Sequence, residues 1–215
     1  MLKMSSINLT EEEIKHYLIN TENVKNGITS QSVFNNDYPL HLEIGCGNGH
    51  FLFARSQIHP MINYLGIEIS KKRILKSIYK INKQSIENIR FIHGDGRYIL
   101  DFYLPNNSLD ACYLNFPDPW PKRKHIKHRI LNPSFIDILH NKLRDNGSFY
   151  FVSDDDFYFF KTLSLFESDT RFMNGFISKY RNNIEEYETS LYEEKWRKMG
   201  KEIYYMLFRK NKLSN

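Results

Sequence analysis

The stretch "HLEIGCGNGHF", His41 to Phe51, decides the fold class, because an apolar run ends there in three closely spaced glycines. The apolar run predicts a buried strand, and the residues after the glycines predict a helix. Gly45, Gly47 and Gly49 let the backbone turn sharply and let a ligand approach the amides at the start of that helix. A dinucleotide-binding loop would need glycine at position 50, where the chain has His50. The loop therefore favours a nucleoside ligand without a pyrophosphate, and a purely structural strand-to-helix turn is the alternative.

Short apolar runs alternate with helix-length segments along the chain, which is the pattern of parallel β-α-β units. The expected strands are Leu40–Ile44, Tyr64–Ile69, Ile89–Ile92, Leu109–Phe116 and Ser148–Ser153, with closing strands around Phe172–Tyr180 and Glu202–Arg209. The expected helices are Glu11–Ile19, Lys71–Lys83 with Ser70 as N-cap, and a segment with apolar Phe135, Ile138, Leu139 and Leu143 that stops at Asn146–Gly147. We therefore expect an α/β chain, with an N-terminal extension at residues 1–37 and one domain at residues 38–212.

Composition limits the classes of protein to which this chain can belong. With 215 residues, of which 41% are hydrophobic, the chain can bury one sizeable core. The formal net charge of +5 favours a polyanionic partner without requiring one. Cys46 and Cys112 lie far apart in the chain, which fits a reducing compartment better than a disulfide or a zinc site. The N-terminus has no apolar signal region and no segment is apolar enough to span a membrane, so we expect a cytoplasmic protein without a bound metal.

Acidic residues end the strands on either side of the glycine loop. Glu68 in "YLGIEIS" ends the strand after that of Glu43, where a carboxylate can accept both hydroxyl protons of a ribose. Asp95 in "HGDGR" ends the following strand, where it can meet the amino group of an adenine. An exposed strand-end acid and a simple turn residue are the respective alternatives. Because ligands of open α/β sheets bind outside the carboxyl ends of the strands, three such acids are more specific than the glycines alone.

The order of "EIGCGNG", "GIEIS" and "GDGR" resembles that of class I S-adenosylmethionine-dependent methyltransferases, and the next strand narrows the resemblance. The stretch "NFPDPWPKRKH", Asn115 to His125, closely resembles the signature of the bacterial tRNA (guanine-N7-)-methyltransferases. The resemblance extends from about Leu40 to Arg209. It implies a Rossmann-like class I methyltransferase fold, with a mostly parallel seven-stranded sheet and helices on both faces. It also implies S-adenosyl-L-methionine as the cofactor and tRNA as the partner.

The resemblance further implies which residues form the site. The implied cofactor-binding residues are Glu43, Gly45, Gly47, Glu68, Asp95 and Asp118, of which Asp118 is also the implied catalytic residue. The implied substrate-binding residues are Lys122, Asp154, Ser190, Tyr192 and Glu193, with Ser190 standing where the family has threonine. For Asp154 an N-cap is the alternative, and Tyr192 and Glu193 could equally belong to an amphipathic helix.

The reaction that the resemblance implies is methylation of guanine N7 in tRNA, in this family at guanine 46 of the variable loop. N7 carries a lone pair and no proton, so no general base is needed, and alignment and electrostatics should carry the rate. Asp118 can either orient the guanine through its N1–H and amino edge or offset the positive charge on the ring. We expect Pro117, Pro119 and Pro121 to hold this acid in place, and Trp120 to pack against the sheet rather than stack on the base.

A basic run follows the prolines and suits a polyanion. Its cations can engage phosphates, and its histidines can add donors; a solvated face is the alternative. The residues concerned are Lys122, Arg123, Lys124, His125, Lys127, His128 and Arg129. The major groove that holds N7 in A-form RNA is deep and narrow, so we expect the target to be a guanine outside a regular helix.

Two other classes of function stay open on the residues alone. One is another amino-methyltransferase, since "NFP" loosely resembles the Asn-Pro-Pro-aromatic loop of adenine-N6 enzymes, although that loop would put proline at Phe116 and has no need of Asp118. The other is an RNA-binding protein that keeps the fold without activity, against which the retained acids argue. No obligatory protein partner is evident.

Overall fold

The computed structural model of the chain describes residues 8–120, 129–185, 187–188 and 191–212. The strands are β1 (Leu18–Ile19), β2 (Leu40–Ile44), β3 (Asn63–Glu68), β4 (Ile89–His93), β5 (Leu109–Asn115), β6 (Leu143–Ser153), β7 (Phe172–Asn174) and β8 (Tyr204–Lys210). The helices are α1 (Glu11–Tyr17), the 3-10 helix η1 (Thr21–Asn23), α2 (Ser30–Phe34), α3 (His50–Ile58), α4 (Lys71–Asn82), α5 (Gly96–Tyr103), α6 (Pro133–Lys142), α7 (Asp156–Glu167) and α8 (Leu191–Lys198).

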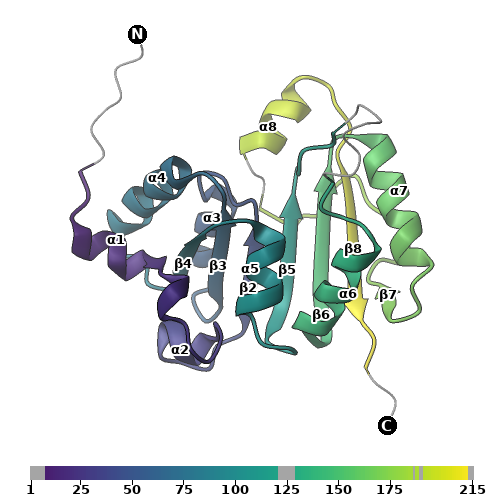
Figure 1. Cartoon of the computed structure of the whole chain (residues 1–215). Coiled ribbons are helices and arrows are strands. Elements are labelled where there is room, and N and C mark those ends of the chain that lie inside the picture. Colours follow the sequence, from purple (N-terminus) through teal and green to yellow (C-terminus); the bar gives the residue numbers. More distant parts are fainter. Residues whose placement is uncertain (1–7, 121–128, 186, 189–190, 213–215) are drawn as a thin grey trace.

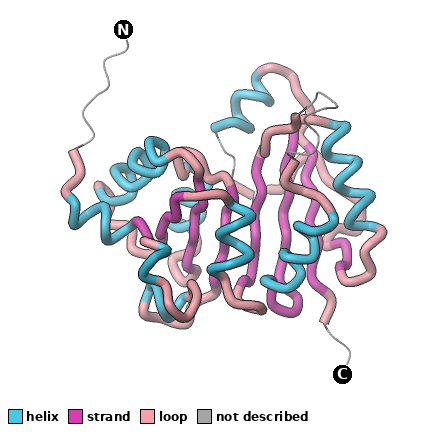
Figure 2. The backbone as a smooth tube through the Cα atoms, in the orientation of Figure 1, coloured by secondary structure: helices cyan, strands magenta, loops and turns pink. Residues whose placement is uncertain are grey.

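The strands form one sheet in the order β1-β4-β3-β2-β5-β6-β8-β7, which Figures 1 and 2 show from one face. β8 is antiparallel to both of its neighbours, and the other pairs of adjacent strands are parallel. The chain runs outward from β2 to β3 and β4, then returns to the other side of β2 as β5. This reversal of strand order creates a crevice at the carboxyl ends of β2 and β5, where open α/β sheets bind their ligands.

The part of the sheet that the structure describes has eight strands, one more than the predicted seven. The additional strand is β1, which pairs Leu18 with Phe91 and Ile19 with Ile92 at the edge of β4. The predicted helix Glu11–Ile19 therefore ends at Tyr17, because the apolar residues after it extend along the sheet edge. The division of the chain near residue 37 stays a prediction, since the segment before it packs against the same sheet.

Helices cover both faces of the sheet, and each face has its own apolar cluster. The first cluster joins the sheet to α5, α6 and α7 through residues such as Leu100, Phe135 and Phe159. The second joins it to α3 and α4 through residues such as Leu52 and Ile78. Burial of each such side chain contributes about 1.5–3 kcal/mol to the free energy of folding. Within the described ranges, no helix is both long and apolar enough to cross a membrane.

The boundary between α6 and β6 differs from the prediction. The helical spacing of apolar residues placed Leu143 in the helix, whereas α6 ends at Lys142 and Leu143 begins β6. Leu143 is extended and fully buried, and its carbonyl oxygen accepts a hydrogen bond from Lys210 Nζ at 2.9 Å. Leu143 also pairs with Leu109 of β5, so its extended conformation agrees with contacts to distant strands and not with the local apolar spacing.

Candidate functional site

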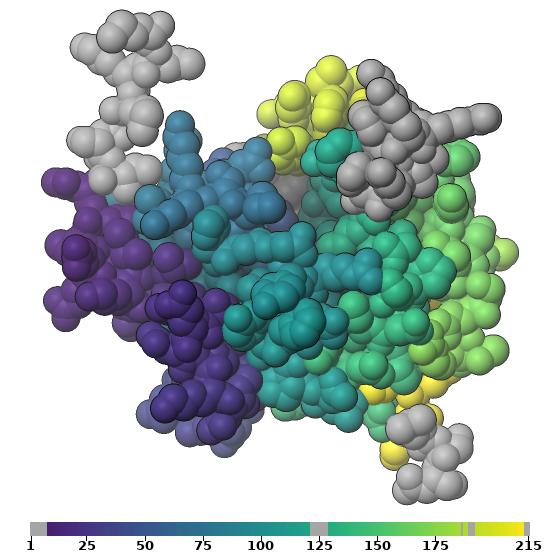
Figure 3. Space-filling model, viewed as in Figure 1, coloured from purple at the N-terminus to yellow at the C-terminus, as the bar shows by residue number. Residues whose placement is uncertain are grey.

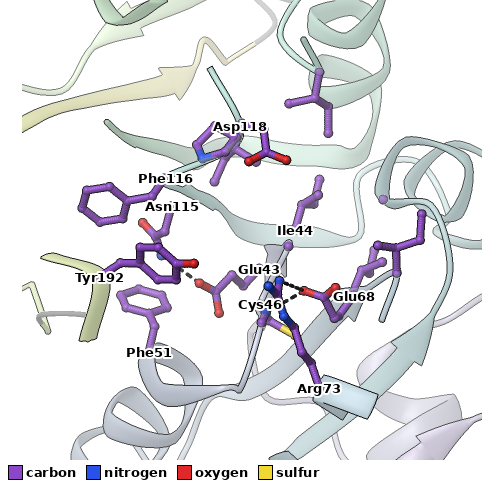
Figure 4. Close-up of a pocket in the computed structure, with 18 of the residues that line it drawn as sticks. Glu43, Ile44, Cys46, Phe51, Glu68, Arg73, Asn115, Phe116, Asp118 and Tyr192 are labelled. Carbon is purple, nitrogen blue, oxygen red and sulfur yellow. Dashed lines mark hydrogen bonds and ion pairs between the residues drawn. The ribbon is translucent and has the colours of Figure 1, made fainter. Parts of the chain in front are cut away.

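A cavity of about 650 Å³ lies at the carboxyl ends of β2, β3, β4 and β5, with residues of α4 and α8 on its rim. Figure 4 shows Asp118 on the side formed by the segment after β5, with Glu43 and Glu68 across from it. The predicted site residues that line the cavity are Glu43, Gly45, Gly47, Glu68, Asp95, Asp118 and Tyr192. The crevice between β2 and β5 thus brings together acids from four segments of the chain.

The floor of the cavity is the glycine loop between β2 and α3. Gly45 and Gly47 have φ angles of 75° and 57°, which side-chain-bearing residues rarely adopt. A Cβ atom added at either glycine would meet no atom within 4 Å, so both positions face open space in the cavity. The loop therefore lets a ligand approach the backbone closely.

Glu68 is almost fully buried at the end of β3 and ties the glycine loop to the start of α4. Its Oε2 accepts a hydrogen bond from Gly47 N at 2.9 Å, and its Oε1 accepts one from Ser70 N at 2.8 Å. Arg73 Nη1 lies 3.8 Å from Oε2. Each carboxylate oxygen keeps a lone pair for a further donor, so this fixed acid can accept from two neighbouring hydroxyl groups of a ligand.

Asp95 lies between β4 and α5, at the edge of the cavity. It is the N-cap of α5, and its Oδ1 accepts a hydrogen bond from Tyr98 N at 2.9 Å. The side chain is also exposed to the cavity that it lines. The cap fixes the carboxylate and leaves Oδ2 able to accept from a ligand.

Glu43 is as deeply buried as Glu68, at 3% exposure. Its Oε1 accepts a hydrogen bond from Asn115 Nδ2 at 2.9 Å, whereas Oε2 is buried and has no partner within the described ranges. Burial raises the pKa of Glu43 to about 7; the hydrogen bond from Asn115 opposes that shift and the charge of Glu68 adds to it. A buried carboxylate with one unpaired oxygen is best stabilised by a cationic donor.

A chain of hydrogen bonds that no local sequence pattern predicts holds Glu43 in place. Tyr187 Oη donates to Asn115 Oδ1 at 2.6 Å, which leaves the amide nitrogen of Asn115 facing Glu43. Tyr187 is buried at 8% exposure, and its ring centroid lies 5.1 Å from that of Phe51. The chain links the ends of β2 and β5 to the segment that precedes α8.

The segment after β5 adopts a strained conformation. Phe116 and Trp120 have φ angles of 49° and 43°, each at a cost of about 1–3 kcal/mol for a bulky residue. Phe116 N donates to Val152 O at 2.8 Å, which anchors the start of the segment to β6. Pro117 and Pro119 restrict the backbone between these residues. Asp118 is therefore presented to the cavity on a stiff support, although its own side chain is exposed.

Arg129 stabilises this segment from the other side, and its predicted role as a phosphate contact is wrong. It is buried at 5% exposure, its Nε donates to Pro119 O at 2.6 Å, and its guanidinium carbon lies 4.5 Å from the centroid of the Tyr158 ring. Arg129 holds the protein backbone instead of an external anion. The rest of the basic run, including Lys122, lies outside the described residues, as does Ser190.

Asp154 and Glu193 do not line the cavity. Asp154 forms an ion pair with Lys201, whose ammonium group lies 4.0 Å from the centroid of the Trp196 ring. Glu193 is buried at 1% exposure and accepts hydrogen bonds from Arg197 and Tyr205. Both acids thus hold the segment around α8. The N-cap of α7 is Asp155 rather than Asp154.

Comparisons with known proteins find methyltransferases. A protein-family model described as "Putative methyltransferase" matches residues 37–206. The chain is 32% identical over 188 residues to the tRNA (guanine-N(7)-)-methyltransferase of Desulfitobacterium hafniense (strain DSM 10664 / DCB-2), an alignment that covers 85% of each protein.

Solved structures share the fold. A 30S ribosomal A1408 methyltransferase from an uncultured bacterium superposes with a TM-score of 0.57 at 15% identity, over 83% of this chain and 91% of that one. A SAM-dependent methyltransferase from Aquifex aeolicus superposes with a TM-score of 0.53 at 12% identity, over 80% and 81% of the two chains. The predicted Rossmann-like methyltransferase fold is confirmed, with eight strands in place of seven in the described part of the chain.

Proposed function

The chain belongs to the family of the tRNA (guanine-N(7)-)-methyltransferases, and on that premise we propose that it methylates N7 of a guanine in tRNA, with S-adenosyl-L-methionine as donor. The proposed product is 7-methylguanosine, and the proposed target is guanine 46 of the variable loop. The observation that carries the proposal is the convergence of Glu43, Glu68, Asp95 and Asp118 on one cavity. A protein that handles tRNA is expected to work in the cytoplasm.

The residues of the cavity fit the proposed cofactor. When bound, S-adenosyl-L-methionine supplies a methyl group on a positively charged sulfur. Glu68 would hold the ribose hydroxyls, because its two oxygens are fixed by backbone amides and still accept. Asp95 would accept from the adenine amino group. The unpaired Oε2 of Glu43 would receive the ammonium group of the methionine part, which supplies the cationic donor that this buried oxygen lacks.

Asp118 is the proposed active-site residue, because it lies on the stiff segment that faces the three other acids. Guanine N7 is already a nucleophile, so no proton has to leave it before methyl transfer. A carboxylate in this position can accept from the N1–H and amino edge of the base and thereby orient N7. It can also offset the positive charge that passes to the purine ring. We expect orientation to contribute more, since Asp118 is exposed and solvent screens its charge.

The proposed substrate contacts lie at the rim. Tyr192, 56% exposed, and Lys195 line the cavity from α8. Asp154 would bind substrate only together with Lys201 or after that ion pair opens. Glu193 would act by holding α8 in place, since its carboxylate is already used by Arg197 and Tyr205. The roles of Lys122 and Ser190 in substrate binding stay predictions, because both residues lie outside the described part of the chain.

The experiment that tests the proposal is methyl transfer to unmodified tRNA, followed by nucleoside analysis. The purified protein is incubated with methyl-labelled S-adenosyl-L-methionine and a tRNA transcript, and label is expected in 7-methylguanosine. A matched transcript with adenine in place of guanine 46 should take up no label. Label in another nucleoside would contradict the base assignment, and equal label in both transcripts would contradict the position.

A further inference from the structure

The exposed face of α4 is basic and contains no acid. Lys71, Lys72 and Arg73 form its first turn, and Lys76 follows on the same exposed side. The opposite face of the helix is buried through Ile74, Ser77, Ile78 and Ile81. The sequence from residue 69 to residue 86 contains no Asp or Glu. The helix therefore presents a stripe of positive charge while its apolar side is fully used by the core.

This arrangement is unfavourable for the helix itself. Lys72 and Lys76 are four residues apart, and like charges at that spacing destabilise a helix by about 0.2–0.5 kcal/mol. Cations in a first turn also oppose the helix dipole. In α1 of the same chain the charges favour the helix dipole, because the acids Glu11–Glu13 lie in the first turn and Lys15 lies in the last. The charges on α4 are thus not explained by the stability of the helix.

Nearby acids do not neutralise this face. Glu68 is 3.8 Å from Arg73, but it is buried and also bonded to the backbone. Glu13 accepts from Asn82 at the far end of α4. The carboxylate of Glu87 contacts His16 and Arg90. Within the ranges that the structure describes, the ammonium groups of Lys71, Lys72 and Lys76 form no ion pair.

The basic face adjoins the rim of the cavity. Arg73 lines the cavity from α4, and Lys195 lines it from α8. Figure 3 shows the blue atoms of α4 and the yellow atoms of α8 on opposite sides of a hollow. Trp120 and Ile130, which flank the basic run, line the same cavity. A nucleotide that places its base in the cavity therefore has cations beside it on more than one side.

We propose that Lys71, Lys72 and Lys76 on α4 bind backbone phosphates of the tRNA whose guanine enters the cavity. The proposal rests on the function proposed above and adds a contact surface on α4, apart from the basic run after β5. Lysine suits this task, because it is a flexible point charge that contacts phosphates without reading sequence. A membrane surface is disfavoured, because α4 has no free apolar face to insert.

The test compares two double variants with the same loss of charge. Lys72→Gln/Lys76→Gln removes two cations from the basic face. Lys25→Gln/Lys161→Gln removes two exposed lysines elsewhere that have no ion pair among the described residues. The affinity of each protein for the tRNA transcript is measured by fluorescence anisotropy between about 50 and 200 mM salt. Calorimetry of S-adenosylmethionine binding, which needs no tRNA, checks that both variants are folded.

We expect the α4 variant to reduce the slope of log K against log salt by about two, and to weaken tRNA binding roughly tenfold. The control variant should keep the wild-type slope, and cofactor affinity should stay unchanged in both. Equal slopes in the two variants would overturn the proposal. Binding to phosphatidylserine vesicles is measured in parallel, and an α4 variant that loses vesicle binding but keeps wild-type affinity for tRNA would also overturn it. The salt slopes test tRNA binding by α4 and do not depend on methyl transfer. The methylation assay therefore tests the proposed function separately.

Discussion

The hydrogen bonds that link Tyr187, Asn115 and Glu43 allow a prediction for the removal of one hydroxyl group. Tyr187→Phe removes only the hydroxyl that donates to Asn115 Oδ1 at 2.6 Å. Asn115 is half-buried, so leaving its Oδ1 without this donor should cost about 1 kcal/mol, which we expect as a loss of unfolding free energy in urea. Without that donor the Asn115 amide is no longer held with its nitrogen facing Glu43. The variant should therefore bind S-adenosylmethionine about five- to tenfold more weakly, equivalent to about 1–1.4 kcal/mol.

The assay is calorimetric titration with two ligands that differ at one end. 5′-Methylthioadenosine has the adenosine part of the cofactor but lacks the amino acid part, so its affinity should be the same for wild type and Tyr187→Phe. Tyr204→Phe, which removes a hydroxyl bonded to Glu202 at the exposed surface, is the matched control and should change neither affinity. An equal loss for both ligands would contradict the role given to Tyr187, because it would show general damage to the cavity. Unchanged affinity for S-adenosylmethionine would refute it as well.

Two further predictions concern the support of the cavity. Burial raises the pKa of Glu43 from 4.5 to about 7, so its contribution to stability is fully present below pH 4.5 and is lost as the pH rises through 7. In urea unfolding, the unfolding free energy of the wild type should be lower at pH 8 than at pH 5, with a contribution of up to roughly 3 kcal/mol from Glu43. The Glu43→Gln variant should lack this contribution. Arg129→Ala leaves Pro119 O without its donor and should destabilise the fold by about 2–3 kcal/mol, while raising KM for tRNA more than Kd for the cofactor. An unchanged melting curve, or equal effects on both ligands, would contradict the role given to Arg129.

The part of the site that the sequence predicts best is the part built by strand ends. Glu43, Glu68 and Asp95 each follow an apolar run, and parallel strands bring such positions to one edge of a sheet. Asp118 was expected because "NFPDPWPKRKH" resembles the signature of the family. Local patterns of this kind are sufficient because the strands themselves carry the residues into the cavity.

Other features depend on contacts that no local pattern reveals. Tyr187 and Asn115 are 72 residues apart in the chain, and nothing around Tyr187 indicates a partner at the end of β5. Arg129 belongs to a basic run in sequence, yet cation-π and backbone contacts bury it. The β1 strand was missed because two residues give no strand periodicity, and β4 supplies the reason for their conformation.

In the proposed function, Asp118 and the three other acids of the cavity together carry methyl transfer to guanine N7. The most direct measurement is the rate of label transfer into 7-methylguanosine by wild type and by Asp118→Ala, at saturating tRNA and cofactor. We expect transfer by the wild type and a loss of at least about a hundredfold in the variant, with the same melting temperature because the side chain is exposed. A variant that labels 7-methylguanosine at a rate near that of the wild type would contradict the proposed role of Asp118 in methyl transfer.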